Sequence, residues 1–265
     1  MSLKTAAKYI IQKGLTPFLS DTKQQHRVII LHEIKEQYQK NFYEFLNLVN
    51  SFPVSMDITI TFDDGFHSSY EVIKRVSPQK AIFFVCPEYV NRVYDTAAWQ
   101  EFFHNNLSRG EQLDDHELLN AVRPVSWEEL GELARLGYRI GSHTMNHARL
   151  SKIISQKELE REIIGSAEMI EDKLQIKVDS LAYPFGDSGS INERALTIIK
   201  KRYKRCFTGV RGNNVRTADA LLVWRDAMDL FCPKDYREFL LRGGFDWYYW
   251  GKRKRIQMME RHASY

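Results

Sequence analysis

Short apolar runs rich in β-branched and aromatic residues alternate along this chain with longer segments of helical periodicity. The runs lie at positions 28–31, 58–62, 81–86, 138–140, 180–183 and 221–224. Several are almost continuously apolar, which is typical of strands buried on both faces of a parallel sheet. Strands that alternate with helices in this way indicate βα units. The sequence therefore predicts an α/β fold built on a parallel sheet or barrel.

Three Ser-x-x-Glu patterns predict where helices between these strands begin, at Ser126, Ser155 and Ser190. The second of these helices carries one apolar stripe, formed by Leu159, Ile163, Ala167, Ile170 and Leu174. Such a stripe is typical of a helix that packs against a sheet.

The 265 residues suit a single domain, because no repeat and no long linker divides them. We expect an N-terminal helical extension over residues 1–26, a main domain over 27–242 and a basic, aromatic tail over 243–265. The polar region from about 90 to 124 interrupts the strand–helix rhythm, and we interpret it as an insertion. Long insertions at the ends of strands often shape a binding site.

Composition excludes several classes of protein. With 43% hydrophobic and 27% charged residues, the chain is neither fibrous nor wholly disordered. The longest apolar run, at 81–86, is far shorter than the ~20 residues of a membrane-spanning helix. Three widely spaced cysteines and a lysine-interrupted N-terminus fit a reducing compartment, so we expect a cytoplasmic location.

Two adjacent carboxylates, Asp63 and Asp64, follow the apolar run at 58–62 and precede Gly65. Barrel active sites are built at the carboxyl ends of strands, and two neighbouring acidic side chains can take different roles there. One can bind a metal while the other remains free as a base. Asp-Asp-Gly is also good turn chemistry, so a purely structural turn stays an alternative.

His143 and His147 follow the run at 138–140. Imidazoles four positions apart lie on the same side of a helical turn, where both can reach one ion. With a carboxylate from another strand end they would complete three protein ligands and an open position, as in catalytic metal sites. A third strand end carries Tyr183, Pro184 and Phe185 before Gly186, a rigid turn able to present backbone N–H groups to an oxyanion.

Together these segments resemble the polysaccharide deacetylase family, the NodB-like carbohydrate esterases. Its three motifs, T-F-D-D-G, H-[ST]-x-x-H and Y-P-[FY]-G, occur here in the family's order, and the resemblance runs from about residue 27 to 226. It implies a distorted, TIM-like (β/α) barrel, often of seven strands, and a divalent metal, usually zinc. Asp64, His143 and His147 would bind the metal and Asp63 would be the general base. The backbone N–H of Tyr183 would stabilise the oxyanion.

The chain departs from the family pattern in two places. Many members carry an arginine three residues before the loop tyrosine, where this chain has Ser180, so we expect Arg225 to orient Asp63 instead. The late Leu-His motif that supplies a general acid in many members has no counterpart here. His32, at the end of the run at 28–31, is our candidate to protonate the leaving amine. A structural role stays open for both Arg225 and His32, and Asp63 could serve as both base and acid.

Residues 200–265 hold 16 of the 38 Lys+Arg but only 7 of the 34 Asp+Glu. Within the segment 245–255, four consecutive aromatics at 247–250 precede four consecutive cations at 252–255. This tail suits an anionic membrane surface, stacking on sugars, or simple packing with a solvated basic end. No nucleic-acid motif accompanies the charge, so we expect no nucleic-acid partner. We expect a hydrolase that removes an acetyl group from an N-acetylated, or alternatively O-acetylated, sugar, on a lipid-linked or nucleotide-linked precursor at the inner membrane face. A deformylase, another amide hydrolase and a silent glycan-binding module remain alternatives.

Overall fold

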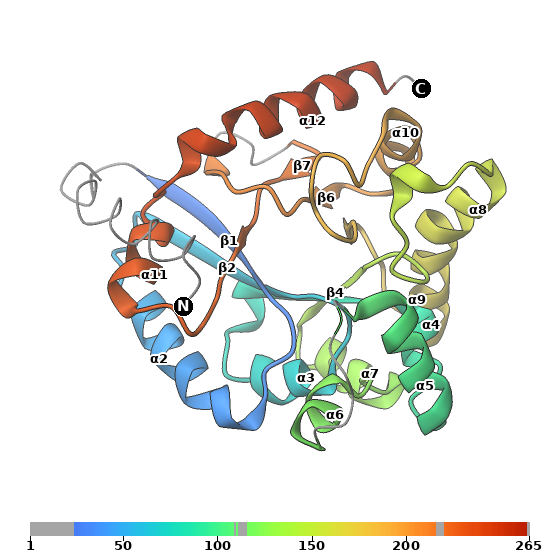
Figure 1. Ribbon diagram of the computed structural model, residues 1–265, viewed down its shortest axis with the longest axis horizontal. Coiled ribbons are helices and arrows are strands. Elements are labelled where there is room, and N and C mark those ends of the chain that lie inside the picture. The colour runs from blue at the N-terminus through green and yellow to red at the C-terminus, as the bar shows by residue number, and fades with distance from the viewer. Residues whose placement is uncertain (1–23, 109, 111–115, 216–219, 264–265) are drawn as a thin grey trace.

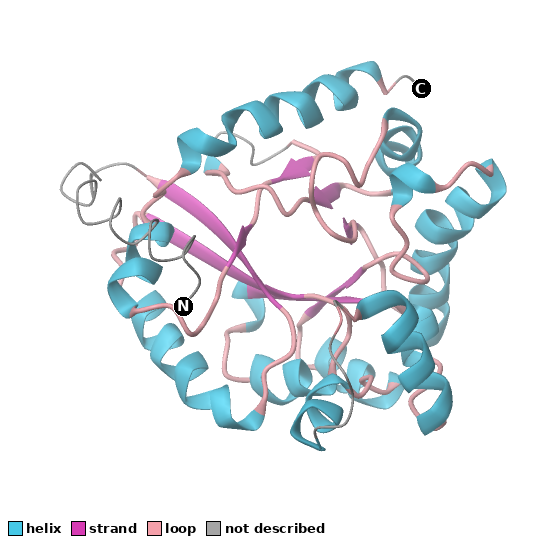
Figure 2. Ribbon diagram, in the orientation of Figure 1, coloured by secondary structure: helices cyan, strands magenta, loops and turns pink. Residues whose placement is uncertain are grey.

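The computed structural model describes residues 24–108, 110, 116–215 and 220–263. Residues 1–23 of the expected N-terminal extension lie outside this part, and Gln25 already belongs to the first strand. The structure is an α/β barrel whose strands are enclosed by a ring of helices (Figure 2). This confirms the fold class and the single domain that the sequence predicts.

Eight strands form one parallel sheet in the order β7-β6-β5-β4-β3-β2-β1-β8 (Figure 1). They are β1 (Gln25–Leu31), β2 (Met56–Phe62), β3 (Ala81–Val85), β4 (Arg139–Ser142), β5 (Ser180–Ala182), β6 (Arg205–Phe207), β7 (Leu222–Val223) and β8 (Asp226–Ala227). The six apolar runs correspond to β1–β5 and β7. β6 and β8 escaped prediction because each is short and includes a charged residue.

The two edge strands of the sheet come from one short segment of chain. β7 pairs with β6, and β8, only two residues further on, pairs with β1 at the other end of the sheet. The segment Leu222–Ala227 therefore spans the seam between the first and last strands. The expected seven strands become eight because this single segment is divided between two neighbours.

Six apolar side chains fill the inside of the barrel: Val28, Ile82, Phe84, Ala182, Phe207 and Val223. A much larger core lies between the sheet and the outer helices, as expected for strands that are buried on both faces. Those helices include α2 (Gln39–Asn50), α3 (His67–Ile73), α7 (Trp127–Arg135), α9 (Ser166–Leu174), α10 (Glu193–Arg202) and α11 (Lys234–Leu241).

The sequence between β3 and α7 forms the expected insertion. It contains α4 (Pro87–Val90), α5 (Thr96–Phe102), a π turn (Phe103–Leu107) and α6 (His116–Val122). It has a small apolar core of its own, formed by Phe66, Cys86, Tyr89, Trp99, Phe102, Phe103, Leu107, Leu118 and Val122. This core fixes the insertion against the end of β2 and β3.

The predicted helix starts have three different outcomes. Ser126 and Glu129 make both hydrogen bonds of a capping box at α7. Ser155 caps α8 (Gln156–Glu160) with one hydrogen bond. The prediction at Ser190 is wrong, because α10 is capped instead by the side chain of Asn192. Ser190 is buried and donates to Asp187, so its hydroxyl stabilises a loop rather than a helix.

The predicted apolar stripe is buried through Leu159, Ile163, Ala167 and Ile170. The helix that carries it is not continuous, because a π turn (Arg161–Gly165) separates α8 from α9. Such turns occur frequently at functional sites, and this one positions Glu162, whose role is described below.

The C-terminal tail folds back as a short 3-10 helix (Asp246–Tyr249) and α12 (Trp250–His262). α12 packs against α10, with Ile256 fully buried and Glu260 paired to Lys200 at 3.2 Å. Among the described residues, no helix combines the length and the apolarity needed to cross a bilayer.

Candidate metal centre at the carboxyl ends of the strands

Asp63 and Asp64 lie where β2 ends, and their carboxylates point to different partners. Asp64 has a left-handed backbone (φ 75°) and Gly65 follows with φ 88°, a conformation that aspartate tolerates and glycine favours. The segment is thus both a tight turn and a site. The turn directs Asp64 towards the two histidines, while Asp63 faces Arg225.

His143 and His147 converge by a route that differs from the predicted helical turn. The segment after β4 is a loop in which Thr144 (φ 62°) and His147 (φ 60°) are left-handed. Buried Glu162 supports this loop by accepting hydrogen bonds from the backbone and the side-chain amide of Asn146, at 2.9 and 2.6 Å. The imidazole centroids of the two histidines lie 5.1 Å apart. The i, i+4 spacing brought them together, but through a supported loop rather than a helix.

Three ligand atoms meet around Asp64. Its Oδ1 lies 3.2 Å from Nε2 of His143 and 3.4 Å from Nε2 of His147. All three atoms fall within 4.8 Å of one another, and all three side chains are at least nine-tenths buried. Oδ1 of Asp64 is buried and has no hydrogen-bond partner among the described residues. A buried carboxylate oxygen facing two imidazole nitrogens is a set of donor atoms that could hold a divalent metal ion.

Backbone carbonyls fix the orientation of both imidazoles. Nδ1 of His143 lies 2.7 Å from the carbonyl oxygen of Ala182, at the end of β5. Nδ1 of His147 lies 2.7 Å from that of Asn106, in the insertion. Because a carbonyl only accepts, each Nδ1 must donate its proton, and each Nε2 is left with a lone pair towards Asp64. Such outer partners are a regular feature of metal-binding histidines.

The protonation of these groups also suits a cation. Burial lowers the pKa of His147 to about 4, so this imidazole is neutral near pH 7. Burial would raise the pKa of Asp64, but the histidines around it outweigh that effect and hold the pKa well below its usual range. Burial lowers the pKa of His143, whereas Asp63 and Asp64 raise it above its ordinary value. A divalent ion bound here would compete with the proton that His143 binds at Nε2.

Arg225 holds Asp63, as the sequence predicts. Its Nη1 donates to Oδ1 of Asp63 at 2.7 Å and to the hydroxyl of Thr61 at 2.9 Å, while its Nε donates to the carbonyl of Thr208. Burial acts to raise the pKa of Asp63, but the guanidinium outweighs it and the pKa lies below its ordinary value. Asp64, His143 and His147, the candidate metal ligands, are called the metal-ligand cluster below. Oδ2 of Asp63 faces this cluster and lies 4.0 Å from Nε2 of His143.

The loop after β5 borders the cluster. The Tyr183 hydroxyl donates to the carbonyl of Gly186 at 2.8 Å. Gly186 (φ 65°) packs so closely on Gly209 that a Cβ would come within 2.5 Å of its backbone. The ring of Phe185 is half exposed, with its centroid 5.0 Å from that of His147. Pro184, which lies between Tyr183 and Phe185 in the sequence, is buried. The Tyr183 N–H makes a long hydrogen bond, 3.4 Å, to the carbonyl of Phe207.

These groups line a cavity of about 400 Å³, which also includes His32, Arg149, Leu107 and Asp187. His32 follows β1, and its carbonyl accepts a hydrogen bond from the Ser69 hydroxyl. The structure therefore brings every predicted site residue except Pro184 to the lining of one cavity. Sequence reasoning missed Arg149, whose guanidinium lies over the Phe185 ring at 3.9 Å, because no motif position marks it.

A comparison with family models supports the assignment. The model described as polysaccharide deacetylase matches residues 54–204, more than half of the chain. The chain therefore belongs to the polysaccharide deacetylase family. A comparison with curated proteins finds no significant match.

Solved structures of this class share the fold. The chain is similar to a polysaccharide deacetylase from Bacillus cereus, with a TM-score of 0.55 and 18% identity over 83% of this chain and 69% of that one. It is similar to IcaB from Ammonifex degensii, with a TM-score of 0.56 and 16% identity over 83% and 97%. It is also similar to the Streptococcus pyogenes deacetylase PplD, solved in complex with acetate, with 0.55 and 15% over 83% and 99%. At these identities the similarity shows a shared fold.

Proposed function

We propose that this chain is a metal-dependent hydrolase that removes the acetyl group from an N-acetylated sugar of a glycan or glycan precursor. The observation that carries the proposal is the unpartnered, buried Oδ1 of Asp64, which faces Nε2 of His143 and His147 at 3.2 and 3.4 Å. The family match supports the carbohydrate substrate.

Asp64, His143 and His147 would hold the ion, which we propose to be zinc. A divalent ion bound there would lower the pKa of a bound water to ~7 and polarise the acetyl carbonyl. The chain supplies the geometry for this: both imidazoles are locked by carbonyls, so their Nε2 atoms stay directed at Asp64.

Asp63 would accept the proton of the attacking water. Its hydrogen bond to Arg225 keeps the carboxylate ionised and fixes its direction, while Oδ2 remains on the side of the metal-ligand cluster. A general base needs the correct ionisation and position before it needs a high pKa.

The other cavity residues would serve the oxyanion and the leaving group. The N–H of Tyr183 is our candidate oxyanion donor, and its existing hydrogen bond to Phe207 is long enough to be exchanged. Pro184 and Phe185 would form the adjoining wall. His32 would protonate the leaving amine as the C–N bond breaks, because it lines the same cavity as Asp63 and Asp64.

A mass-spectrometric screen of amino-sugar conjugates tests this function. Loss of acetyl supports it, whereas loss of formyl would make the chain a deformylase and acetyl loss only from O-acetylated sugars would make it an esterase. Metal analysis tests the site independently: we expect one equivalent of zinc in the wild type and none in Asp64→Ala. Protein that binds no metal but retains glycan affinity would instead be a silent binding module.

The tail supports a further part of the proposal, contact with an anionic membrane that carries a lipid-linked substrate. α12 exposes Trp250, Lys254 and Met258 on one face, next to exposed Trp247 and Tyr248. Aromatic and basic side chains together favour the interface of anionic bilayers. Flotation with anionic and neutral liposomes at low salt tests this, with Trp247→Ala/Trp250→Ala as the variant. Equal flotation of variant and wild type, or none, contradicts it. A nucleotide-linked substrate and the cytoplasmic location remain predictions.

A further inference from the structure

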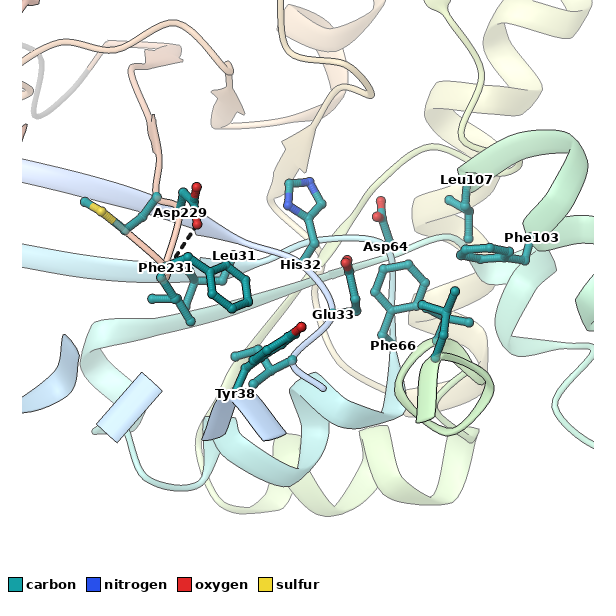
Figure 3. Close-up of a pocket in the computed structure, with 15 residues that line it drawn as sticks. Leu31, His32, Glu33, Tyr38, Asp64, Phe66, Phe103, Leu107, Asp229 and Phe231 are labelled. Atoms are coloured by element: carbon teal, nitrogen blue, oxygen red, sulfur yellow. Dashed lines mark hydrogen bonds between the residues drawn. The ribbon is translucent and has the colours of Figure 1, made fainter. Parts of the chain in front are cut away.

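The cavity of about 400 Å³ described above, which contains Asp63 and Asp64, is called the catalytic cavity here. A second cavity, of about 310 Å³, adjoins it. The two share His32, Asp64 and Leu107 in their walls, so they adjoin at the metal-ligand cluster. Figure 3 shows Tyr38 and Phe231 on one side of the second cavity and Asp64 and Leu107 on the other, with His32 between them. Its volume lies at the lower end of the ~300–1,000 Å³ typical of ligand sites.

The two cavities differ in charge. Apolar side chains contribute to the walls of the second: Leu31, Ile34, Phe66, Phe103, Leu118, Val122, Met228 and Leu230. Besides Asp64, its charged lining consists of Glu33 and Asp229, and within the described part of the chain no lysine or arginine lines it. The catalytic cavity, by contrast, contains Arg149 and Arg225. An anionic group is therefore disfavoured in the second cavity.

An aromatic pair stands at this cavity in a fixed position. Phe231 is 58% exposed, and its ring meets that of Tyr38 edge-to-face with centroids 4.2 Å apart. The loop that carries it is held in two places. The Asn41 side chain donates to the carbonyl of Leu230 at 3.1 Å, and the N–H of Phe231 donates to Oδ1 of Asp229 at 2.9 Å. A pre-positioned, exposed ring face suits the apolar C–H face of a sugar.

We infer that the second cavity binds the sugar unit adjacent to the one that is deacetylated, with this neighbour stacked on Phe231 and free of anionic substituents. The inference rests on the proposed function, because it places the reacting acetamide at the metal-ligand cluster. Carboxylates of Glu33 and Asp229 would accept hydrogen bonds from the hydroxyls or the amine of this neighbour.

Much of this cavity belongs to this chain rather than to the part that matches the family. The family match covers residues 54–204, whereas the segments 31–38 and 228–231 lie outside it. These two segments supply both aromatic rings and both additional carboxylates.

Kinetics with defined glycosides test the inference. The substrates are the methyl glycosides of N-acetylglucosamine and of its β-1,4- and β-1,6-linked disaccharides, with acetate release as the readout. We expect Phe231→Ala to lower the ratio of disaccharide to monosaccharide kcat/KM about tenfold, the lower end for loss of one apolar contact. Tyr43→Ala, which removes a partly exposed ring on α2 outside the cavity, should leave the ratio unchanged.

The charge argument has its own arm. A disaccharide whose neighbouring sugar carries a carboxylate should be a poor substrate, and Glu33→Gln/Asp229→Asn should improve its kcat/KM about tenfold. Glu36→Gln, an exposed carboxylate outside the cavity, is the control. Two results together overturn this inference alone, provided that the wild type turns over. Phe231→Ala leaves the disaccharide-to-monosaccharide ratio of kcat/KM unchanged, and Glu33→Gln/Asp229→Asn leaves kcat/KM for the carboxylated disaccharide unchanged. Absence of turnover on every glycoside, with metal bound, contradicts the proposed function and the inference with it.

Discussion

Two buried groups of arginine and aspartate side chains lie at the barrel seam, one on the inner face of the sheet and one on the outer face. Arg225 and Asp226 are neighbours in sequence, and alternation along an extended chain sends their side chains to opposite faces. Arg225 points into the barrel, against the rings of Phe84 and Phe207, and holds Asp63. Asp226 points outwards and pairs with Arg27, which is fully buried.

The outward group is a closed network. Arg27 donates through Nε to Asp226 at 2.9 Å and through Nη1 to Asp246 at 2.6 Å. Arg211 adds an ion pair to the same two carboxylates, at 3.5 and 3.2 Å. These contacts join β1, β8 and the start of the tail. The inward group instead lies beside an unpartnered Asp64 oxygen and two imidazole lone pairs. The first arrangement balances two guanidinium groups against two carboxylates, and Oδ1 of Asp226, which makes no hydrogen bond to the described residues, still has an ion pair with Arg211. The second leaves a carboxylate oxygen and two imidazole nitrogens as donor atoms that could hold a cation.

The largest effect is expected at the open cluster. Asp64→Asn should lower kcat at least ~10³-fold, because the variant loses a metal ligand and with it the acid–base chemistry of the site. Its free energy of unfolding without metal should fall only modestly, because burial offsets much of the stabilisation that the two histidines give the ionised carboxylate. Activity assays, metal analysis and denaturant titration of metal-free protein measure these effects, with the exposed Asp172→Asn as control. A strongly destabilised Asp64→Asn would mean that Asp64 is a structural residue.

The closed network should respond in the opposite way. Asp226→Ala should lower the free energy of unfolding by about 3–5 kcal/mol, because Arg27 becomes a buried cation without its main partner. The folded fraction should retain metal and measurable turnover. Denaturant titration together with kcat per folded molecule checks this. Complete inactivation of well-folded Asp226→Ala would show that the seam network and the site are not separable.

Arg225→Lys lies between these two cases. We expect kcat to fall about 10²-fold, since a lysine cannot reproduce the hydrogen bonds to Asp63, Thr61 and Thr208. Burial acts to raise the pKa of Asp63, and the lysine would oppose this less than Arg225 does, so the pKa of Asp63 should rise in the variant. Ionised Asp63 would then be lost at a higher pH, so the acidic limb of the kcat/KM profile should move towards neutral pH. A lower kcat with an unmoved profile would limit Arg225 to a packing role.

The smallest expected effect is on how the free energy of unfolding depends on pH, through Asp246 in the seam network. Burial acts to raise the pKa of Asp246, but Arg27 and Arg211 hold it below its ordinary value. A lowered pKa means that its stabilisation is complete above the unfolded-state pKa of ~3.9 and is lost as pH falls through the folded-state value. Asp246→Asn should therefore be less stable than the wild type at pH 7, and the difference should narrow below about pH 4. A pH-independent difference would contradict this.

Much of the site could be predicted from the sequence because side-chain chemistry recurs at strand ends. Asp63, Asp64, His143 and His147 each follow a readable apolar run, and parallel strands bring their carboxyl ends to one edge. Arg225 was predicted from the family resemblance, and it lies against Asp63 in the structure. The family resemblance is confirmed by the match over 54–204.

The sequence by itself determined the α/β class and the side chains that could bind a metal. The tertiary structure alone decided which atoms converge at the candidate metal centre, because the carbonyls of Ala182 and Asn106 that orient the two imidazoles carry no residue-type signal. It also decided how the barrel closes, through a segment shared between β6 and β1, and it created the second cavity from segments almost 200 residues apart. Such contacts depend on long-range packing, which local propensity and motif spacing do not encode.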